Sequence, residues 1–259
     1  MSIELHDLIQ YIKYFFLKED RHSIQSPLAY KIYDGLLAHK KHKKNPEIET
    51  IRKKFLMDNR ILPMHDLGAG SKKTSTKSNR TLKKVAKYSN SPKKFNLLYQ
   101  YFLSITPSIY CVELGTGVGL NAAYLSAYTT GRLITIEGDP TLYDISSGHL
   151  KQLKNVSSRL GDIDILLPQL IKELPHIDFI LIDANHTYDA TMAYFHMLIP
   201  RMGADSIIII GDIYWSPEMT KAWKEIMAHP LITLSFDFYE CGVLFFKPNI
   251  SRAHYIMDY

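Results

Sequence analysis

A glycine-rich turn follows a short apolar strand near the middle of the chain. The strand covers residues 109–114 and includes Glu113, and it leads into Gly115-Thr116-Gly117-Val118-Gly119 before a helix expected to begin near Asn121. Glycine permits tight backbone geometry with positive φ and lets a ligand approach the main chain closely. The N–H groups at a helix start attract anionic groups. This pattern predicts a nucleotide-like cofactor at the carboxyl end of the first strand of a doubly wound α/β sheet.

Acidic residues end the strands that follow this turn. The acids are Glu137, Asp162, Asp183 and Asp212, and they end strands expected over residues 132–137, 156–162, 177–183 and 206–212. Short apolar runs separated by helical stretches are typical of buried parallel strands. Because such sheets bind ligands at the carboxyl ends of their strands, we expect these acids to share one site. A carboxylate at the position of Glu137 can accept hydrogen bonds from ribose hydroxyls.

The end of the chain predicts a different sheet from that of a dinucleotide dehydrogenase. Strands expected over residues 231–238 and 243–247 are joined by only four residues, which is too short for a crossover and therefore indicates an antiparallel hairpin. The glycines at 115, 117 and 119 also depart from the spacing Gly-x-Gly-x-x-Gly of dinucleotide-binding turns.

Together these features resemble the class I S-adenosylmethionine (SAM) methyltransferases over residues 95–248. The resemblance implies a Rossmann-like, doubly wound, seven-stranded sheet with a C-terminal antiparallel hairpin. It also implies a binding site for SAM, in which Glu137 contacts the ribose and Asp162 the adenine. The residues expected around the amino-acid end of SAM are Glu113, Gly115, Thr116, Gly117 and Gly119, with Asp183 beside them.

The segment after the fourth strand, Asp183-Ala184-Asn185-His186-Thr187-Tyr188-Asp189, resembles that of catechol O-methyltransferase-like enzymes. In metal-dependent members this Asp and an acidic pair after the fifth strand bind a divalent cation, which lowers the pKa of the acceptor hydroxyl. Here Asp183 and Asp212 match, but Gly211 and Ile213 flank Asp212, so the second member of the pair is absent. A Mg²⁺ site at Asp183 and Asp212, with Asn185 and waters, is one interpretation.

His186 offers another interpretation of the same segment. A neutral imidazole near pH 7 can accept the proton of a hydroxyl as the methyl group arrives. The alternative is a histidine that only hydrogen-bonds Asp183 or Asp212 and shapes the loop. Tyr188, Tyr214 and Trp215 are expected to wall the acceptor pocket.

Two further segments resemble uncharacterised SAM-dependent methyltransferases of Bacteroidota-type bacteria. They are Trp215-Ser216-Pro217-Glu218-Met219 and His22-Ser23-Ile24-Gln25-Ser26-Pro27. This resemblance extends over the whole chain and implies a bacterial enzyme without naming a substrate.

Composition divides the 259-residue chain into a basic N-terminal extension (1–94) and a methyltransferase domain (95–259). Residues 1–100 contain 21 Lys and Arg against 9 Asp and Glu, whereas the remaining residues contain 10 against 17. No apolar run approaches the roughly 20 residues of a membrane helix, and no signal peptide is apparent. Two cysteines without metal-binding spacing suit a reducing compartment, so we expect a cytoplasmic protein without membrane contact.

The basic extension is expected to be helical over residues 3–17, 27–39 and 47–57. A second glycine-rich segment, residues 65–71, lacks a preceding central strand and is interpreted as a loop. Residues 71–94 contain nine Lys and Arg and no acid, which is a possible surface for RNA or another polyanion. Such a run is also common on solvated surfaces. The extension is expected to cap the cleft of the following domain, and it is equally suited to packing on a partner subunit in a homodimer.

The sequence thus predicts a SAM-dependent methyltransferase that acts on a small-molecule hydroxyl, with Asp183, His186 and Asp212 at the transfer site. Three alternatives stay open: an RNA methyltransferase that uses the basic extension as a clamp, a SAM-binding protein without turnover, and an aminopropyltransferase on the same fold.

Overall fold

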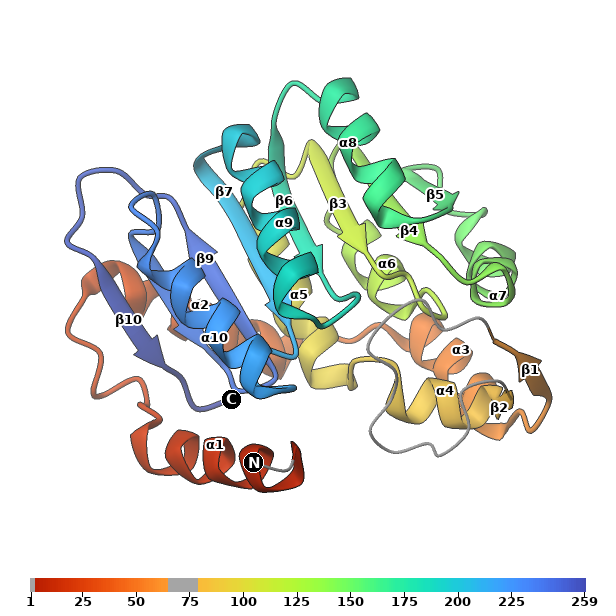
Figure 1. Ribbon diagram of the computed structural model, residues 1–259, viewed down its shortest axis with the longest axis horizontal. Helices are drawn as coiled ribbons and strands as arrows, with labels where there is room; N and C mark the ends of the chain where they lie inside the picture. The colour runs from red at the N-terminus through yellow and green to blue at the C-terminus, as the bar shows by residue number, and fades with distance from the viewer. Residues whose placement is uncertain (1–2, 65–78) are drawn as a thin grey trace.

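The computed structural model describes residues 3–64 and 79–259. Its centre is an eight-stranded sheet in the order β10-β8-β9-β7-β6-β3-β4-β5 (Figure 1). Strands β5, β4, β3, β6 and β7 are parallel, whereas β9 is antiparallel to both of its neighbours. The strands are β3 (Tyr110–Leu114), β4 (Arg132–Glu137), β5 (Val156–Leu160), β6 (Ile177–Ile182), β7 (Met202–Gly211), β8 (Leu234–Asp237), β9 (Cys241–Phe245) and β10 (Ala253–Ile256).

The predicted α/β class and the C-terminal antiparallel hairpin are confirmed, but the sheet has one strand more than the seven expected. The additional strand β10 lies parallel to β8, with Ala253 opposite Leu234. Tyr255 of β10 packs edge-on against Phe236 of β8, with ring centroids 6.1 Å apart. A four-residue strand shows too little alternation to be recognised in a sequence, because its pairing partner defines it.

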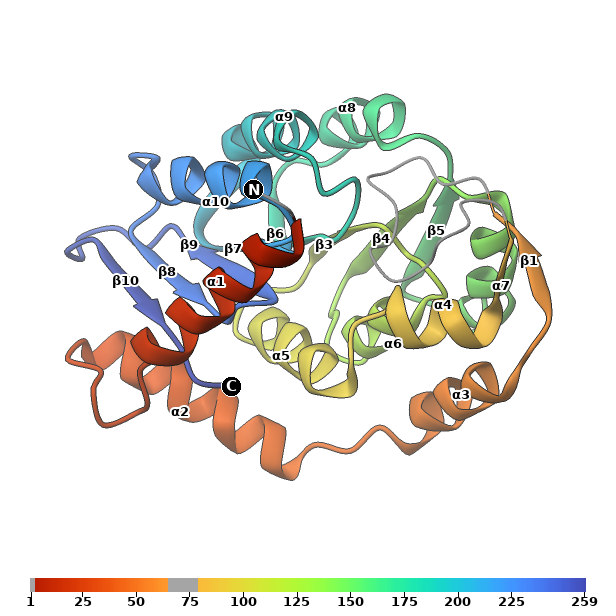
Figure 2. The same ribbon diagram turned by 60° about the horizontal axis from the view of Figure 1, so that its bottom comes forward.

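Helices cover both faces of this sheet (Figure 2). Helices α2 (Pro27–His42), α5 (Lys93–Ser104) and α6 (Leu120–Ser126) lie on one face, and α8 (Ile163–Glu173), α9 (Tyr188–Leu198) and α10 (Pro217–Ala228) lie on the other. Alternate strand residues supply the two cores: on β3, Cys111 packs with α2 and α5, whereas Val112 packs with α8 to α10. This alternation explains why the strands are apolar throughout, since both faces are buried.

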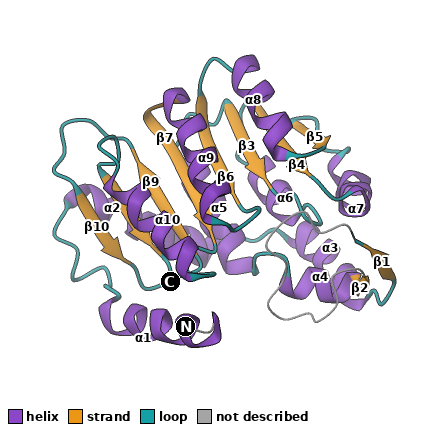
Figure 3. Cartoon of the chain, viewed as in Figure 1, coloured by secondary structure: helices purple, strands orange, loops and turns teal. Residues whose placement is uncertain are grey.

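The N-terminal region wraps around the sheet (Figure 3). Helix α1 (Ile3–Leu17) lies against the C-terminal end of the chain, where the Tyr14 hydroxyl donates to the Met257 carbonyl at 2.8 Å. Helix α2 packs on α5, and Leu36 of α2 lies in the same core as the sheet. Helix α3 (Pro46–Met57) contacts α4 (Leu82–Tyr88) and α6.

The remaining described elements are α7 (Pro140–Leu150), the 3-10 helix η1 (Ile199–Arg201) and a small antiparallel sheet of β1 (Ile61–Pro63) and β2 (Asn79–Thr81).

The helices of the N-terminal region begin where the sequence indicates. The Ser26 hydroxyl caps α2 by accepting from the Ala29 N–H at 3.3 Å, and Pro27 takes the first helical position. The glycine-rich segment 65–71 and the first eight residues of the basic stretch, 71–78, lie outside the described residues. The division at residue 94 stays a prediction. In the described part of the chain, no helix combines the length and apolar character needed to cross a bilayer.

Candidate active site

A cavity of about 490 Å³ lies at the carboxyl ends of the parallel strands. We call its lining residues between 115 and 215 the strand-end wall and the other lining residues the outer wall. The strand-end wall contains eight residues that the sequence predicts as site residues: Gly115, Thr116, Gly117, Glu137, Asp162, Asp183, His186 and Asp212. The fold therefore brings together most of the predicted site, because parallel strands place their carboxyl ends at one edge.

The glycine turn between β3 and α6 has the backbone geometry that only glycine adopts readily. Gly115 and Gly117 have φ values of +93° and +57°. A Cβ atom on Gly115 would lie 2.2 Å from the Asp183 carbonyl oxygen, so the turn and the end of β6 are in direct backbone contact. Gly117 donates its N–H to Glu137 Oε2 at 2.7 Å. The turn is thus fixed by β6 on one side and by the end of β4 on the other.

Gly119 and Glu113 lie away from the cavity lining. Gly119 has a φ of +81° and begins α6, and a Cβ atom there would lie 3.0 Å from His149 Nε2. Glu113 is fully buried, and its Oε2 accepts from the Thr135 hydroxyl at 2.5 Å. Burial raises the pKa of Glu113 well above its usual range. The structure gives both residues a packing role beneath the turn, and does not place the Glu113 carboxyl where it would meet an ammonium group directly.

Glu137 and Asp162 end neighbouring strands and face the cavity. Glu137 is 8% exposed, and its second oxygen accepts from the Asp139 N–H at 2.9 Å. Burial raises the pKa of Glu137. Asp162 caps α8 by accepting from the Asp164 N–H at 2.9 Å. These positions suit the ribose and adenine contacts expected of them, which stay predictions.

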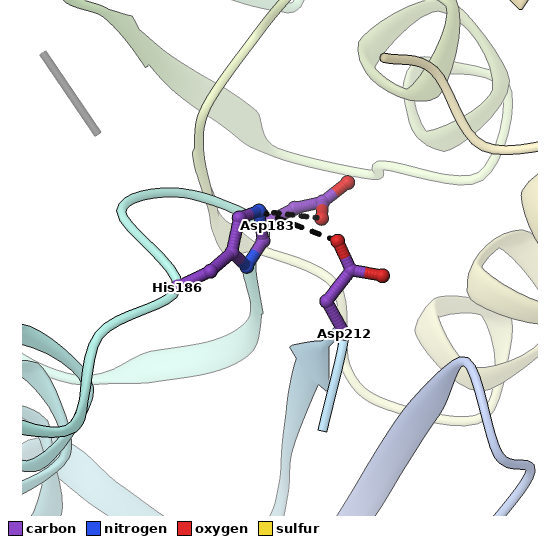
Figure 4. A group of neighbouring side chains, drawn as sticks. All are labelled: Asp183, His186 and Asp212. Atoms are coloured by element: carbon purple, nitrogen blue, oxygen red, sulfur yellow. Dashed lines mark ion pairs between the residues drawn. The ribbon is translucent and has the colours of Figure 1, made fainter. Parts of the chain in front are cut away.

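Asp183, His186 and Asp212 form a compact group (Figure 4). His186 Nε2 lies 3.5 Å from Asp212 Oδ2 and 4.0 Å from Asp183 Oδ1. One donor atom from each residue lies within 4.8 Å of the other two. Burial raises the pKa of Asp183, as does the nearby Asp212, while His186 lowers it. Two carboxylates and an imidazole at this separation can hold a divalent cation or share a proton.

Strained loop geometry places two of these three side chains. His186 and Asp212 have φ values of +45° and +52°, which are uncommon for residues with a side chain. Gly211 precedes Asp212, and a Cβ atom there would lie 2.5 Å from Asp183 Oδ1. A side chain at position 211 would therefore displace the Asp183 carboxylate. Such outliers concentrate at functional sites, where the surrounding structure sustains the strain.

The structure supplies no second acid after β7. Ile213 is fully buried in the core on the α8–α10 face, so the position next to Asp212 offers no ligand. Asn185 lines the cavity and donates to the Tyr194 hydroxyl. A mixed donor set of two carboxylates and one imidazole suits Mn²⁺ or Zn²⁺ better than Mg²⁺, which prefers oxygen ligands.

The outer wall contains residues that the sequence does not indicate. Asp7 of α1 reaches the cavity, and the Tyr239 hydroxyl donates to its carboxylate at 2.7 Å. Tyr239 packs on Tyr214 of the strand-end wall with ring centroids 5.5 Å apart, and the ring of Trp215 in the same wall lies 5.9 Å from that of His186. Further lining residues are Met64, Arg80, residues 87–92, Phe95, Tyr99 and Glu240. No motif marks them, because contacts remote in sequence bring them together.

Tyr214 and Trp215 thus line the cavity as predicted, but Tyr188 does not. The Tyr188 hydroxyl donates to Glu225 of α10 at 2.6 Å. Tyr188 is the first residue of α9, directly after the Thr187 cap, and the helix turns it away from the strand ends. The prediction that Tyr188 walls the acceptor pocket is therefore wrong.

Comparison with known proteins agrees with the fold. Residues 112–213 match a family model described as a methyltransferase domain. An O-methyltransferase from Bacillus cereus in complex with S-adenosylhomocysteine (SAH) is 18% identical, with a TM-score of 0.50 over 60% of this chain and 82% of that one. A Streptomyces achromogenes O-methyltransferase of tomaymycin synthesis, in complex with SAM, is 14% identical, with a TM-score of 0.52 over 61% and 82%.

A SAH-bound methyltransferase from Podospora anserina is 17% identical, with a TM-score of 0.51 over 61% of this chain and 80% of that one. No curated protein matches the chain. The resemblance to methyltransferases is thus confirmed, while the resemblance to Bacteroidota sequences stays a prediction.

Proposed function

We propose that this methyltransferase-domain protein transfers the methyl group of SAM to a hydroxyl of a small-molecule acceptor. The observation that carries the proposal is the strand-end wall. There, the glycine turn, Glu137 and Asp162 share one cavity with Asp183, His186 and Asp212. The first three features suit a nucleoside with an amino-acid chain, and the last three suit deprotonation of an acceptor. Complexes of similar folds with SAM and SAH support this choice of cofactor.

The residues fit SAM along the ends of β3, β4 and β5. The backbone between Gly115 and Gly117 lies open to the cavity, so the amino-acid portion of SAM can approach the main chain closely. Glu137 has its lone pairs partly engaged by the Gly117 and Asp139 N–H groups, and its remaining lone pairs are available to ribose hydroxyls. Asp162 is placed to accept from the adenine amino group. SAM supplies an electrophilic methyl group when bound.

The acceptor would lie between the glycine turn and His186. Methyl transfer from a sulfonium is an in-line displacement, in which an acceptor oxygen bonds to the methyl carbon as the carbon–sulfur bond breaks. Positioning therefore contributes much of the rate. The His186 imidazole accepts the hydroxyl proton, and the Asp212 carboxylate, 3.5 Å from Nε2, stabilises the resulting imidazolium. Tyr214 and Trp215 restrict the acceptor from the side.

A divalent cation at Asp183, His186 and Asp212 is the second form of the same proposal. The three donor atoms are close enough to hold one ion, which would lower the pKa of the acceptor hydroxyl. His186 would then be a ligand and not the base. A dependence of turnover on Mn²⁺ that chelation reverses would favour this form, whereas turnover in the presence of a chelator would favour His186 as the base.

The alternatives from the sequence are not favoured. The similar structures include O-methyltransferases that bind SAM or SAH. Of the basic stretch, Arg80 and Lys87 line the cavity. RNA binding, a homodimer and a cytoplasmic location stay predictions.

Calorimetry with SAM and SAH tests the proposal first. Micromolar binding of both, followed by SAH formation with at least one member of a panel of catechols and phenols, is the expected result. A complete lack of SAM and SAH binding would exclude a SAM-dependent reaction. Binding of both without SAH formation across the panel would instead favour a SAM-binding protein without turnover.

A further inference from the structure

A chain of buried polar side chains connects the N-terminal region to Asp183. Arg52 of α3 donates from Nη2 to Asn96 Oδ1 on α5. Asn96 donates from Nδ2 to Asn121 Oδ1 on α6. Asn121 in turn donates from Nδ2 to Asp183 Oδ2 at 3.4 Å. Four elements far apart in the sequence thus contribute to one hydrogen-bonded path that ends at the candidate active site.

The path is directional because a guanidinium can only donate hydrogen bonds. Arg52 therefore requires Asn96 to present its carbonyl oxygen, which turns the Asn96 NH₂ toward Asn121. The Asn121 carbonyl must accept from it, so the Asn121 NH₂ faces the Asp183 carboxylate. The exposed fractions of Arg52, Asn96 and Asn121 are 9%, 0% and 6%, so water competes little for these bonds.

Arg52 also holds the outer wall of the cavity. Its Nη1 donates to the Ser91 carbonyl at 3.2 Å, and Ser91 is a lining residue. The Glu49 carboxylate accepts from Arg52 Nε at 3.0 Å and from the Tyr124 hydroxyl at 2.7 Å, which balances the buried positive charge. One guanidinium is thereby linked both to Asp183 on the strand-end wall and to Ser91 on the outer wall.

We infer that Arg52, Asn96 and Asn121 are positioning residues that set the orientation of the Asp183 carboxylate relative to His186. The inference rests on the proposed function, since it concerns the reaction that Asp183 serves. The bond from Asn121 engages Oδ2 and leaves Oδ1 on the side of His186, 4.0 Å from Nε2. This role would let α3 help to position the active site although it precedes the methyltransferase-domain match.

The arrangement has a specific reason in this site. Asp183 and Asp212 both approach His186, and like charges so close favour rotation of one carboxylate away from the other. Gly211 leaves space for Asp183 but supplies no side chain to hold it. The Asn121 NH₂ group, which Asn96 holds in place, supplies that restraint by donating to Asp183. Partners of this kind that orient a reacting or ligating group typically change activity by about 10- to 100-fold when removed.

Side-chain amide signals test the path without any substrate. Protein labelled with ¹⁵N-asparagine would be compared by NMR as wild type, Arg52→Met and Arg52→Lys, with Asn96, Asn121 and Asn155 assigned from single Asn→Ser variants. We expect Arg52→Met to shift the NH₂ signals of both Asn96 and Asn121, and Arg52→Lys to shift them less. Asn155 is the control, because its NH₂ donates to the Ser126 and Thr129 carbonyls outside the path. An unchanged Asn121 signal in folded Arg52→Met would overturn the inference.

Kinetics then test the consequence for catalysis. With an acceptor from the phenol panel, Arg52→Met and Asn96→Leu should each lower kcat by about 10-fold or more, with the SAH Kd changed by less than about 3-fold. The double variant should lose little more than either single variant, and Arg52→Lys should recover part of kcat. Asn155→Leu should lower thermal stability and leave kcat unchanged. Equal losses of kcat in Asn155→Leu and Arg52→Met would show that the path affects activity only through general stability.

The two proposals fail differently. Absence of SAM binding by the wild type would remove the proposed function and leave the NMR result on the path intact. Normal SAM binding and turnover in Arg52→Met would instead contradict the positioning role alone.

Discussion

The strand-end wall and the outer wall of the cavity have different origins. The strand-end wall comes from residues 115–215, which almost coincide with the methyltransferase-domain match, and its predicted site residues end or follow predicted strands. The outer wall combines Asp7, residues 80–99 and Tyr239, which meet only in the folded chain. The comparison teaches that the residues proposed for methyl transfer lie in one wall. We expect selectivity for the acceptor to reside in the other.

The largest effect should follow a change at the centre of the strand-end wall. His186→Ala removes the group that accepts the hydroxyl proton, so kcat should fall by about 10²- to 10⁴-fold. SAH affinity, measured by calorimetry, should change little. The matched control is His196→Ala, since His196 lies exposed on α9. Full activity in His186→Ala would show that another group accepts the hydroxyl proton.

A smaller effect is expected at the cofactor end of the same wall. Glu137→Ala removes the acceptor of the Gly117 and Asp139 N–H groups and the proposed partner of the ribose. Stranding such groups costs about 1–3 kcal/mol, so SAH binding by calorimetry should weaken by that amount. Glu137→Gln, which retains one carbonyl oxygen, should lose less. Wild-type affinity in both variants would place the ribose elsewhere.

An effect of similar size on stability is expected behind the outer wall, at Asp237. This fully buried carboxylate accepts from the Tyr214 hydroxyl at 2.5 Å and from the Tyr239 N–H at 2.8 Å, and burial raises its pKa to about 6. The folded state then binds its proton more tightly than the unfolded state, whose pKa is near 3.9. The stability this provides is complete below about pH 4 and is lost as the pH rises through about 6.

Asp237→Asn should therefore reduce the loss of stability between pH 4 and pH 8. In the variant the free energy of unfolding should fall by about 1–3 kcal/mol less than in the wild type over this range, and its Tm should change correspondingly less. Thermal denaturation of wild type and variant in matched buffers measures it. Because other groups titrate in both proteins, the difference between the two curves isolates Asp237. Parallel curves would show that Asp237 stays ionised in the folded protein.

The smallest effect is expected at Tyr239 of the outer wall, and it tests most directly whether the two walls have separate roles. Tyr239→Phe removes the hydrogen bond to Asp7 but keeps the ring against Tyr214, at a cost of about 0.5–1.5 kcal/mol. We expect a change in the acceptor KM of up to about 10-fold, with SAH affinity retained. Tyr188→Phe loses a hydrogen bond to Glu225 outside the cavity, so it should change neither the acceptor KM nor the SAH affinity. A loss of SAH affinity in Tyr239→Phe would contradict the assignment of the outer wall to the acceptor.

The sequence predicted the fold and the strand-end wall well, for identifiable reasons. The glycine turn, Glu137, Asp162 and Asp183 are found at strand ends because short apolar strands and their end residues are recognisable locally. The errors concern side-chain direction and pairing. Tyr188 turns toward Glu225, and β10 adds to β8 beyond the expected hairpin.

The sequence by itself determined which residues stand at the strand ends, because a parallel sheet converts the order of its strands into one common edge. The tertiary structure decided which of those residues reach the cavity. Glu113 is sealed between β3 and β4 next to Thr135, while Glu137 remains open. It also decided that Asp7 meets Tyr239, 232 residues away, and that Arg52 connects to Asp183. Such contacts depend on the packing of distant segments, which no local spacing encodes.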